Sequence, residues 1–179
     1  MAEPSMYERA LGADFQRLPE AVQRFHRLQG AWTLTGEVET EAPTTWLARC
    51  LAWGLGTPRR ATRGAIRFEL LASPTVETWR RHFPAQTMPS TLRLQGRELQ
   101  ESLGLSRLRF RLAASPQGLE MLLVELHFLG LPCPRWLRPR IVAREQGRGQ
   151  RLHFEVSADV PFIGRVAGYR GHLDLPEAP

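Results

Sequence analysis

Residues 106–112 read Ser-Arg-Leu-Arg-Phe-Arg-Leu, which is the clearest two-residue alternation in the chain. In an extended backbone, Leu108, Phe110 and Leu112 would point to one side and the three intervening arginines to the other. Such an alternation predicts a strand that buries one face and leaves the other in water. We therefore expect a sheet with a distinct inner side.

Similar alternation recurs along most of the chain beyond residue 30. Strands are expected near residues 31–39, 66–70, 76–83, 92–94, 107–112, 119–129, 140–146, 151–160 and 166–174. Most are joined by short turns, which predicts antiparallel pairing. The expected fold class is α+β, with about eight or nine strands in a strongly curved, mostly antiparallel sheet that either stays open or forms a partial barrel.

Helices are expected in the N-terminal 30 residues. Ser5 and Glu8 have the spacing of a capping box, and Pro19 suits the first turn of a second helix that ends near Gly30. We expect these helices to pack on the concave side of the sheet.

A further short helix is expected over residues 44–55, Thr-Thr-Trp-Leu-Ala-Arg-Cys-Leu-Ala-Trp-Gly-Leu. It is apolar nearly all round, which favours burial in the core. The alternatives are a lid over an apolar cavity and an apolar surface for a membrane or a partner. Candidates for a lid or apolar surface are Trp46, Leu47, Trp53 and, in a proline-rich connection, Trp136.

The length of 179 residues fits a single domain, 1–179. It would comprise a helical segment, 1–30, a sheet, 31–175, with the inserted helix 44–55, and a frayed tail, 176–179. No stretch approaches the roughly 18 apolar residues of a membrane span, and no secretory signal is visible, so a cytoplasmic location is expected.

The net charge is +6, and every basic residue is arginine because the chain contains no lysine. Absence of lysine and asparagine fits a G+C-rich coding sequence, and the arginines are spread along the chain. We therefore expect no nucleic-acid partner, although a basic balance alone would suggest one. Cys50 and Cys133 have no metal-site spacing and are expected to be small buried apolar side chains.

Several motifs together resemble a bacterial family, the domain of unknown function 4166. The resemblance runs from Met6 to Leu175 and rests on the stretches MYERALGADFQRLPEAVQRFHR (6–27), WRRHF (79–83), LQESLGLSRLRFRL (99–112), LGLPCPRWLRPRIVAREQ (129–146) and PFIGRVAGYRGHL (161–173). Such domains occur alone or fused to saccharopine-dehydrogenase-like domains, which implies a dehydrogenase-like protein as a possible partner. The resemblance implies no activity, and without a glycine-rich dinucleotide fingerprint no cofactor is expected.

Catalytic signatures are missing: there is no nucleophile elbow, phosphate loop or zinc-protease motif. Three pairs of residues share a strand face and offer metal-ligand chemistry, namely Glu125 with His127, His153 with Glu155, and His172 with Asp174. Their neighbours in each strand have the pattern of the core face, so these pairs are expected on a wet face. No metal is expected.

Trp79, Arg81 and Phe83 share one face of a predicted strand. A guanidinium between aromatic rings suits the carboxylate or phosphate of a ligand. The alternative is an internal ion pair with Glu101 or Glu145, or an outward-facing stripe.

His26 lies beside the apolar stripe of its helix, as a hydrogen-bonded core residue or as an acid, base or ligand contact. Tyr169 either ties down a strand end or points into a cavity. We favour a soluble binding module for an apolar or amphipathic small molecule with an anionic group. The alternatives are docking on a dehydrogenase-like partner and an enzyme that uses His26, Glu101, Glu145 and Tyr169 for proton transfer.

Overall fold

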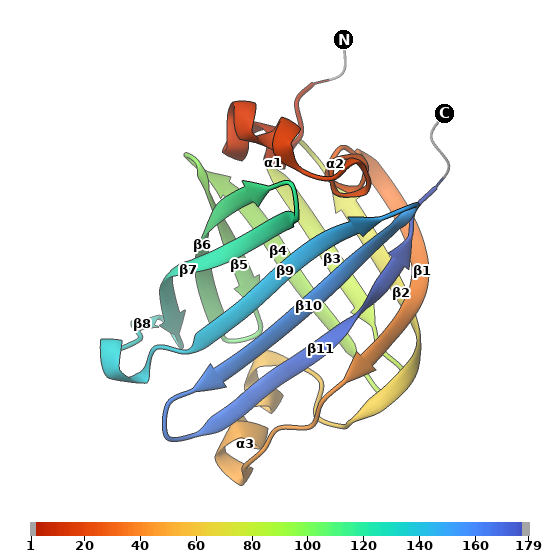
Figure 1. The fold of residues 1–179 in the computed structure, drawn as a ribbon. Coiled ribbons are helices and arrows are strands. Elements are labelled where there is room, and N and C mark those ends of the chain that lie inside the picture. The colour runs from red at the N-terminus through yellow and green to blue at the C-terminus, as the bar shows by residue number, and fades with distance from the viewer. Residues whose placement is uncertain (1–2, 177–179) are drawn as a thin grey trace.

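The computed structural model describes residues 3–176, whose strands form one antiparallel sheet (Figure 1). The strands are β1 (Gly30–Thr40), β2 (Thr62–Ala72), β3 (Val76–His82), β4 (Thr87–Gln95), β5 (Glu98–Leu103), β6 (Ser106–Ser115), β7 (Gly118–Phe128), β8 (Leu131–Pro132), β9 (Arg140–Arg148), β10 (Arg151–Val160) and β11 (Gly164–Asp174). The helices are α1 (Met6–Leu11), α2 (Glu20–His26) and α3 (Trp46–Leu55), with 3-10 segments η1 (Gly12–Arg17) and η2 (Arg135–Leu137). Of the tail expected at 176–179, only Pro176 lies within the described residues.

Ten strands close into a barrel in the order β6-β5-β4-β3-β2-β1-β11-β10-β9-β7, because β7 also pairs with β6. The α+β fold class and the antiparallel, curved sheet are confirmed. The expected eight or nine strands and partial closure fall short of the ten strands that close the barrel. The predicted strand near 92–94 is β4, and β5, which follows it after a turn at Gly96, was missed. The inward-facing Glu101 interrupts the apolar pattern of β5 and hid it from sequence reasoning.

The barrel is joined least completely between β7 and β9. These strands pair only at Leu119 with Glu145 and at Glu120 with Arg144. Gly118 permits this approach, because a Cβ there would lie 2.0 Å from the Glu145 carbonyl oxygen. Beyond these pairs β7 turns to β8 while β9 stays with β10, so the two strands separate along the rest of their length.

The helices lie across the two ends of the barrel rather than on the concave side of an open sheet (Figure 1). α1 and α2 cover one end, where Ser5 and Glu8 form the predicted capping box. α3 crosses the other end. The Thr45 hydroxyl, at its start, donates to the Ile163 carbonyl at 2.6 Å, and the Leu105 amide donates to the Gly54 carbonyl at 3.2 Å. α3 is thus fixed to the β10–β11 turn and to the β5–β6 turn.

α3 is not buried all round, which corrects the preferred interpretation of its sequence. Ala48 and Ala52 are fully buried, whereas Trp46 and Trp53 are 72% and 71% exposed. Cys50 is also exposed, contrary to expectation. The apolar composition indicated burial on all sides, but a helix laid across an open barrel end buries only the side that faces the barrel. None of the helices in 3–176 has the length and apolar character needed to span a membrane.

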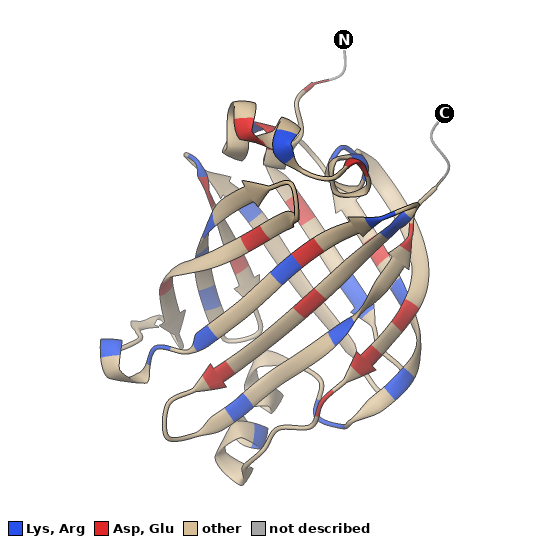
Figure 2. Cartoon of the chain, in the orientation of Figure 1, with Lys and Arg blue, Asp and Glu red and all other residues tan. Residues whose placement is uncertain are grey.

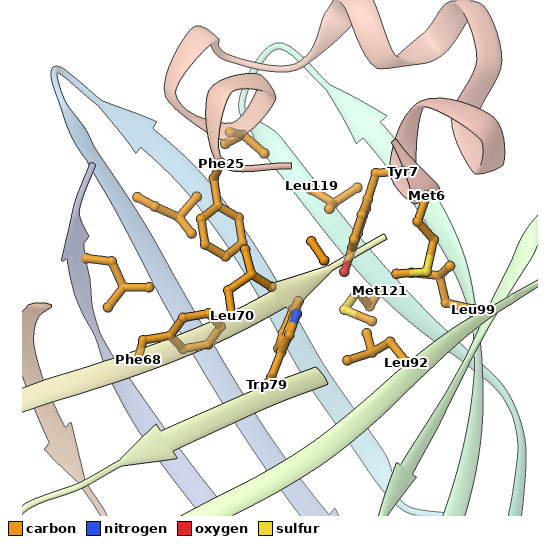
Figure 3. Packing of buried hydrophobic residues seen from close by; sticks show 14 of the residues in the cluster. Met6, Tyr7, Phe25, Phe68, Leu70, Trp79, Leu92, Leu99, Leu119 and Met121 are labelled. Atoms are coloured by element: carbon orange, nitrogen blue, oxygen red, sulfur yellow. The ribbon is translucent and has the colours of Figure 1, made fainter. Parts of the chain in front are cut away.

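The core lies inside the barrel under α1 and α2, and alternate strand residues fill it. Figure 3 shows Tyr7 reaching down from α1 among Leu99, Met121 and Trp79. Outside, Arg and acidic side chains are interspersed on the strands (Figure 2), as in the pair of Arg170 with Glu39 at 3.0 Å. Many of the arginines therefore have acidic partners within the protein, and their presence does not require an anionic ligand.

Candidate functional site: a cavity inside the barrel

A cavity of about 420 Å³ occupies the barrel between the core and α3. Its size falls within the range of small-molecule sites. Most of the lining is apolar, with Leu51 and Leu55 contributed by the inner side of α3. Leu126 and Ile141 line it where β7 and β9 separate. The cavity therefore reaches both the helix across the barrel end and the incompletely joined side.

Arg81 supplies a buried positive charge in this cavity. Its Nη1 donates to the Ser90 hydroxyl at 3.1 Å, and its Nη2 lies 3.5 Å from Glu101. The guanidinium also lies 4.8 Å from the centre of the Trp79 ring, as a cation–π contact requires. The expected internal partner Glu101 is therefore present, but through one long contact rather than a two-pronged bond. Within residues 3–176, two of the five N–H groups of Arg81 make hydrogen bonds.

The Trp79 ring is held in place by Glu77, a residue that sequence reasoning missed. The indole N–H donates to the Glu77 carboxylate at 2.8 Å. Burial raises the pKa of Glu77 to about 7, although His26 and the indole N–H act in the opposite direction. A signal was available, because Glu77 lies two residues before Trp79 and so shares its face.

His26 lies behind the cavity wall at the end of α2, and its Nε2 is 2.5 Å from Glu145. Its ring stacks on Tyr7, with 3.6 Å between ring centres. Both side chains are fully buried, yet the Tyr7 hydroxyl and His26 Nδ1 have no hydrogen-bond partner in the described part of the chain. Burial raises the pKa of Tyr7 well above its usual value. Tyr7 was not among the predicted site residues, since its spacing in α1 indicated only a core position.

Tyr169 and Phe83 pack together at the cavity wall on the side of β11. Tyr169 lines the cavity, and the Phe83 ring packs behind it with 5.2 Å between ring centres. Burial raises the pKa of Tyr169, so its hydroxyl stays neutral and can donate. Of the alternatives for Tyr169, the structure places it in the cavity wall rather than at a strand end.

The predicted site residues thus come together in one region. Five of them line the cavity directly: Trp79, Arg81, Glu101, Glu145 and Tyr169. His26 and Phe83 stand one layer behind. The outward side chains of Trp46, Leu47, Trp53 and Trp136 do not face the cavity, and all four are exposed. The inner residues of α3 that do line it, Leu51 and Leu55, were not singled out.

The residues considered for a metal lie on the outside of the barrel. His127 Nε2 lies 3.5 Å from the Glu125 carboxylate, and the rings of His153 and His172 are 5.6 Å apart in a separate, shallow hollow. Residues 3–176 contain no group of three His, Cys, Asp or Glu side chains arranged to hold a metal ion.

No curated protein matches the chain in sequence. Among solved structures, "Crystal Structure of Rv2717c from M. tuberculosis" is similar at 11% identity and a TM-score of 0.46, over 89% of this chain and 99% of that chain. The sequence profile of one family matches residues 18–173, most of the chain. The chain belongs to the family described as "Domain of unknown function (DUF4166)".

Proposed function

We propose that this barrel is a binding module for an amphipathic or apolar small molecule with an anionic group. The apolar part of the ligand would lie along the cavity toward α3, and the anionic group would meet Arg81. The observation that carries the proposal is the cavity of about 420 Å³ that joins an apolar lining to a buried guanidinium.

The apolar lining favours such a ligand because each Å² of apolar surface removed from water contributes roughly 25 cal/mol. A ligand with a long hydrocarbon part would transfer most of its surface to this environment. Charged contacts are few, so the ligand would be recognised by shape, apolarity and one polar end, as in many small-molecule sites.

Arg81 supports the anionic end. Its guanidinium is removed from water, where a charge-assisted hydrogen bond is stronger, and it has donors to spare. The neutral Tyr169 hydroxyl lines the same cavity and offers a further donor. Glu101 already faces Arg81, so the incoming anion must displace its 3.5 Å contact or arrive with a proton. We therefore expect tighter binding of a carboxylic acid at lower pH.

The test compares dodecanoate with dodecanol, which share a hydrocarbon chain and differ in the charged end. Titration of the delipidated protein should show the carboxylate bound at least about tenfold more tightly, the effect of one added charge-assisted hydrogen bond. The double variant Arg81→Met/Glu101→Leu removes both charges together and should abolish that preference while still binding dodecanol. Equal affinities in the unmodified protein would refute the anionic end of the ligand.

A second variant fills the cavity at Ala143, which lines it on β9. Ala143→Trp places an indole in the cavity and should remove binding of both compounds. Unchanged binding in a folded Ala143→Trp protein would place the ligand elsewhere and overturn the proposal.

An acid–base enzyme is a second candidate, favoured by one observation. Glu145 lines the cavity and is 2.5 Å from His26, which is buried behind it. Such a pair can hold a proton next to a ligand. Conversion of a bound compound that stops in Glu145→Gln but continues in Glu120→Gln, an outer-face control, would favour this candidate. Docking on a dehydrogenase-like protein remains a third proposal, tested by complex formation between the two purified proteins.

A further inference from the structure

Large exposed apolar side chains gather at one end of the molecule. They lie on the outer side of α3, at the β10–β11 turn, and around β8 and η2 (Figure 1). We call this set the apolar rim: Trp46, Trp53, Leu129, Leu131, Trp136 and Phe162. Hydrogen bonds connect its parts, because Leu129 donates its amide to Leu105, and Leu105 donates to Gly54 of α3.

Two members of the rim also have an unfavourable backbone. Leu129 and Phe162 have φ angles of 52° and 63°, and among residues 3–176 they are the non-glycine residues with positive φ. Phe162 follows Pro161 in a turn closed by the Ile163 amide on Val160, where glycine is the usual residue. It is 90% exposed. Placing bulky apolar side chains in left-handed turns, facing water, stabilises neither the turn nor the isolated protein.

Around α3, β8 and η2 the charge is positive, whereas Glu41 and Asp159 near the β10–β11 turn are paired with Arg165. Residues 42–68 and 126–144 contain no Asp or Glu, and these segments include α3, β8 and η2. Arg49 and Arg135 are exposed there and form no ion pair with any residue in 3–176. Figure 2 shows basic residues on α3 and η2. On the barrel wall, by contrast, arginines such as Arg170 have acidic partners.

We propose that the α3 end of the barrel docks on the surface of an anionic lipid bilayer. Tryptophan is the side chain most typical of the interface between lipid headgroups and hydrocarbon, and arginine binds phosphate headgroups. The rim consists of separate tips, on α3, at the β10–β11 turn, and around β8 and η2. A fluid surface accommodates such tips without shape complementarity, as interfacial helices and loops do.

The position of α3 would allow a docked barrel to exchange a ligand with the bilayer. Its outer side carries Trp46 and Trp53, and its inner side carries Leu51 and Leu55 against the cavity. One helix therefore separates the ligand cavity from the docked bilayer. An amphipathic ligand would move between them without crossing water. This exchange rests on the proposed function, whereas the docking itself does not require a ligand in the cavity.

The test is flotation of the purified protein with vesicles of phosphatidylcholine alone or phosphatidylcholine mixed with phosphatidylglycerol. We expect binding to the mixed vesicles, weakened by salt because charges attract across water. Arg49→Gln/Arg135→Gln should reduce the affinity about thirtyfold, since each arginine near an anionic surface contributes roughly a factor of five. The matched control Arg93→Gln/Arg148→Gln, at exposed arginines away from α3, should leave it unchanged.

A second pair of variants tests the apolar contacts. Trp46→Ser/Trp53→Ser should lower vesicle binding by about tenfold or more, through loss of two interfacial side chains. Leu71→Ser is the control, because Leu71 is exposed on β2 outside the rim. The proposal would be overturned if the control variants lost as much vesicle binding as the test variants, or if the unmodified protein did not bind the mixed vesicles. It would also be overturned if Trp46 and Trp53 formed the contact of a concentration-dependent dimer and did not contact the vesicle.

The cavity-filling variant Ala143→Trp separates this proposal from the proposed function. It should lose dodecanoate binding and keep vesicle binding. Vesicle binding without any ligand binding in the unmodified protein would refute the cavity function alone, and ligand binding without vesicle binding would refute docking alone.

Discussion

The buried carboxyl of Glu77 makes the stability of the barrel depend on pH. Burial raises its pKa from 4.5 to about 7 in the folded protein. The folded state therefore holds a proton that the unfolded chain releases between these values. The contribution to stability is present in full below pH 4.5 and is lost as the pH rises through 7. At roughly 1.4 kcal/mol for each pKa unit, the loss is about 3 kcal/mol.

The perturbation is Glu77→Gln, whose amide oxygen can still accept the hydrogen bond from the Trp79 indole. The assay is urea unfolding at pH 5 and pH 8, with the free energy of unfolding compared between variant and parent. The difference should change by about 2.5 kcal/mol in favour of the variant between pH 5 and pH 8, because a small part of the loss has already occurred at pH 5. His26 and Glu145, the charged groups that act on Glu77 from α2 and β9, are present in both proteins. A difference independent of pH, or one equal to that of the outer-face control Glu120→Gln, would refute this reasoning.

Three further changes probe the barrel. Arg81→Met alone should cost about 3 kcal/mol of unfolding free energy, because Glu101, whose side chain is 13% exposed, would be left without its charged partner; adding Glu101→Leu should restore most of it. Gly118→Ala should destabilise strongly in thermal melts, since its Cβ would lie 2.0 Å from the Glu145 carbonyl oxygen; a small change in Tm would show that β7 and β9 yield easily. Ser5→Ala should cost about 1 kcal/mol by urea unfolding through the lost cap on α1, and no loss would mean that α1 is held by packing alone.

Local patterns in the sequence predicted the parts of the fold that depend on neighbouring residues. Alternation placed Leu108, Phe110 and Leu112 on the inner face, and all three are buried in the barrel. The same rule placed Trp79 and Arg81 on one face, and the structure shows that this face points inward. It extends to Glu77, although a lone carboxylate in a strand is usually on the wet face.

Closure of the barrel could not be predicted in this way. It depends on the meeting of β7 with β9 at Glu145, between strands separated in the chain by β8 and η2. The local pattern of either strand is the same whether or not they pair. Trp46 and Trp53 were named as candidates for an apolar surface, but burial of α3 was preferred, because hydrophobicity does not tell which side of a helix faces the barrel and which faces outward.

A native mass spectrum can show whether the cavity holds an amphipathic anion, as we propose. Freshly purified protein should carry an added mass of a few hundred daltons, typical of a ligand for a cavity of about 420 Å³. That mass should disappear on denaturation and be absent from the Ala143→Trp protein. A bare protein that also fails to take up dodecanoate added in excess would contradict the claim.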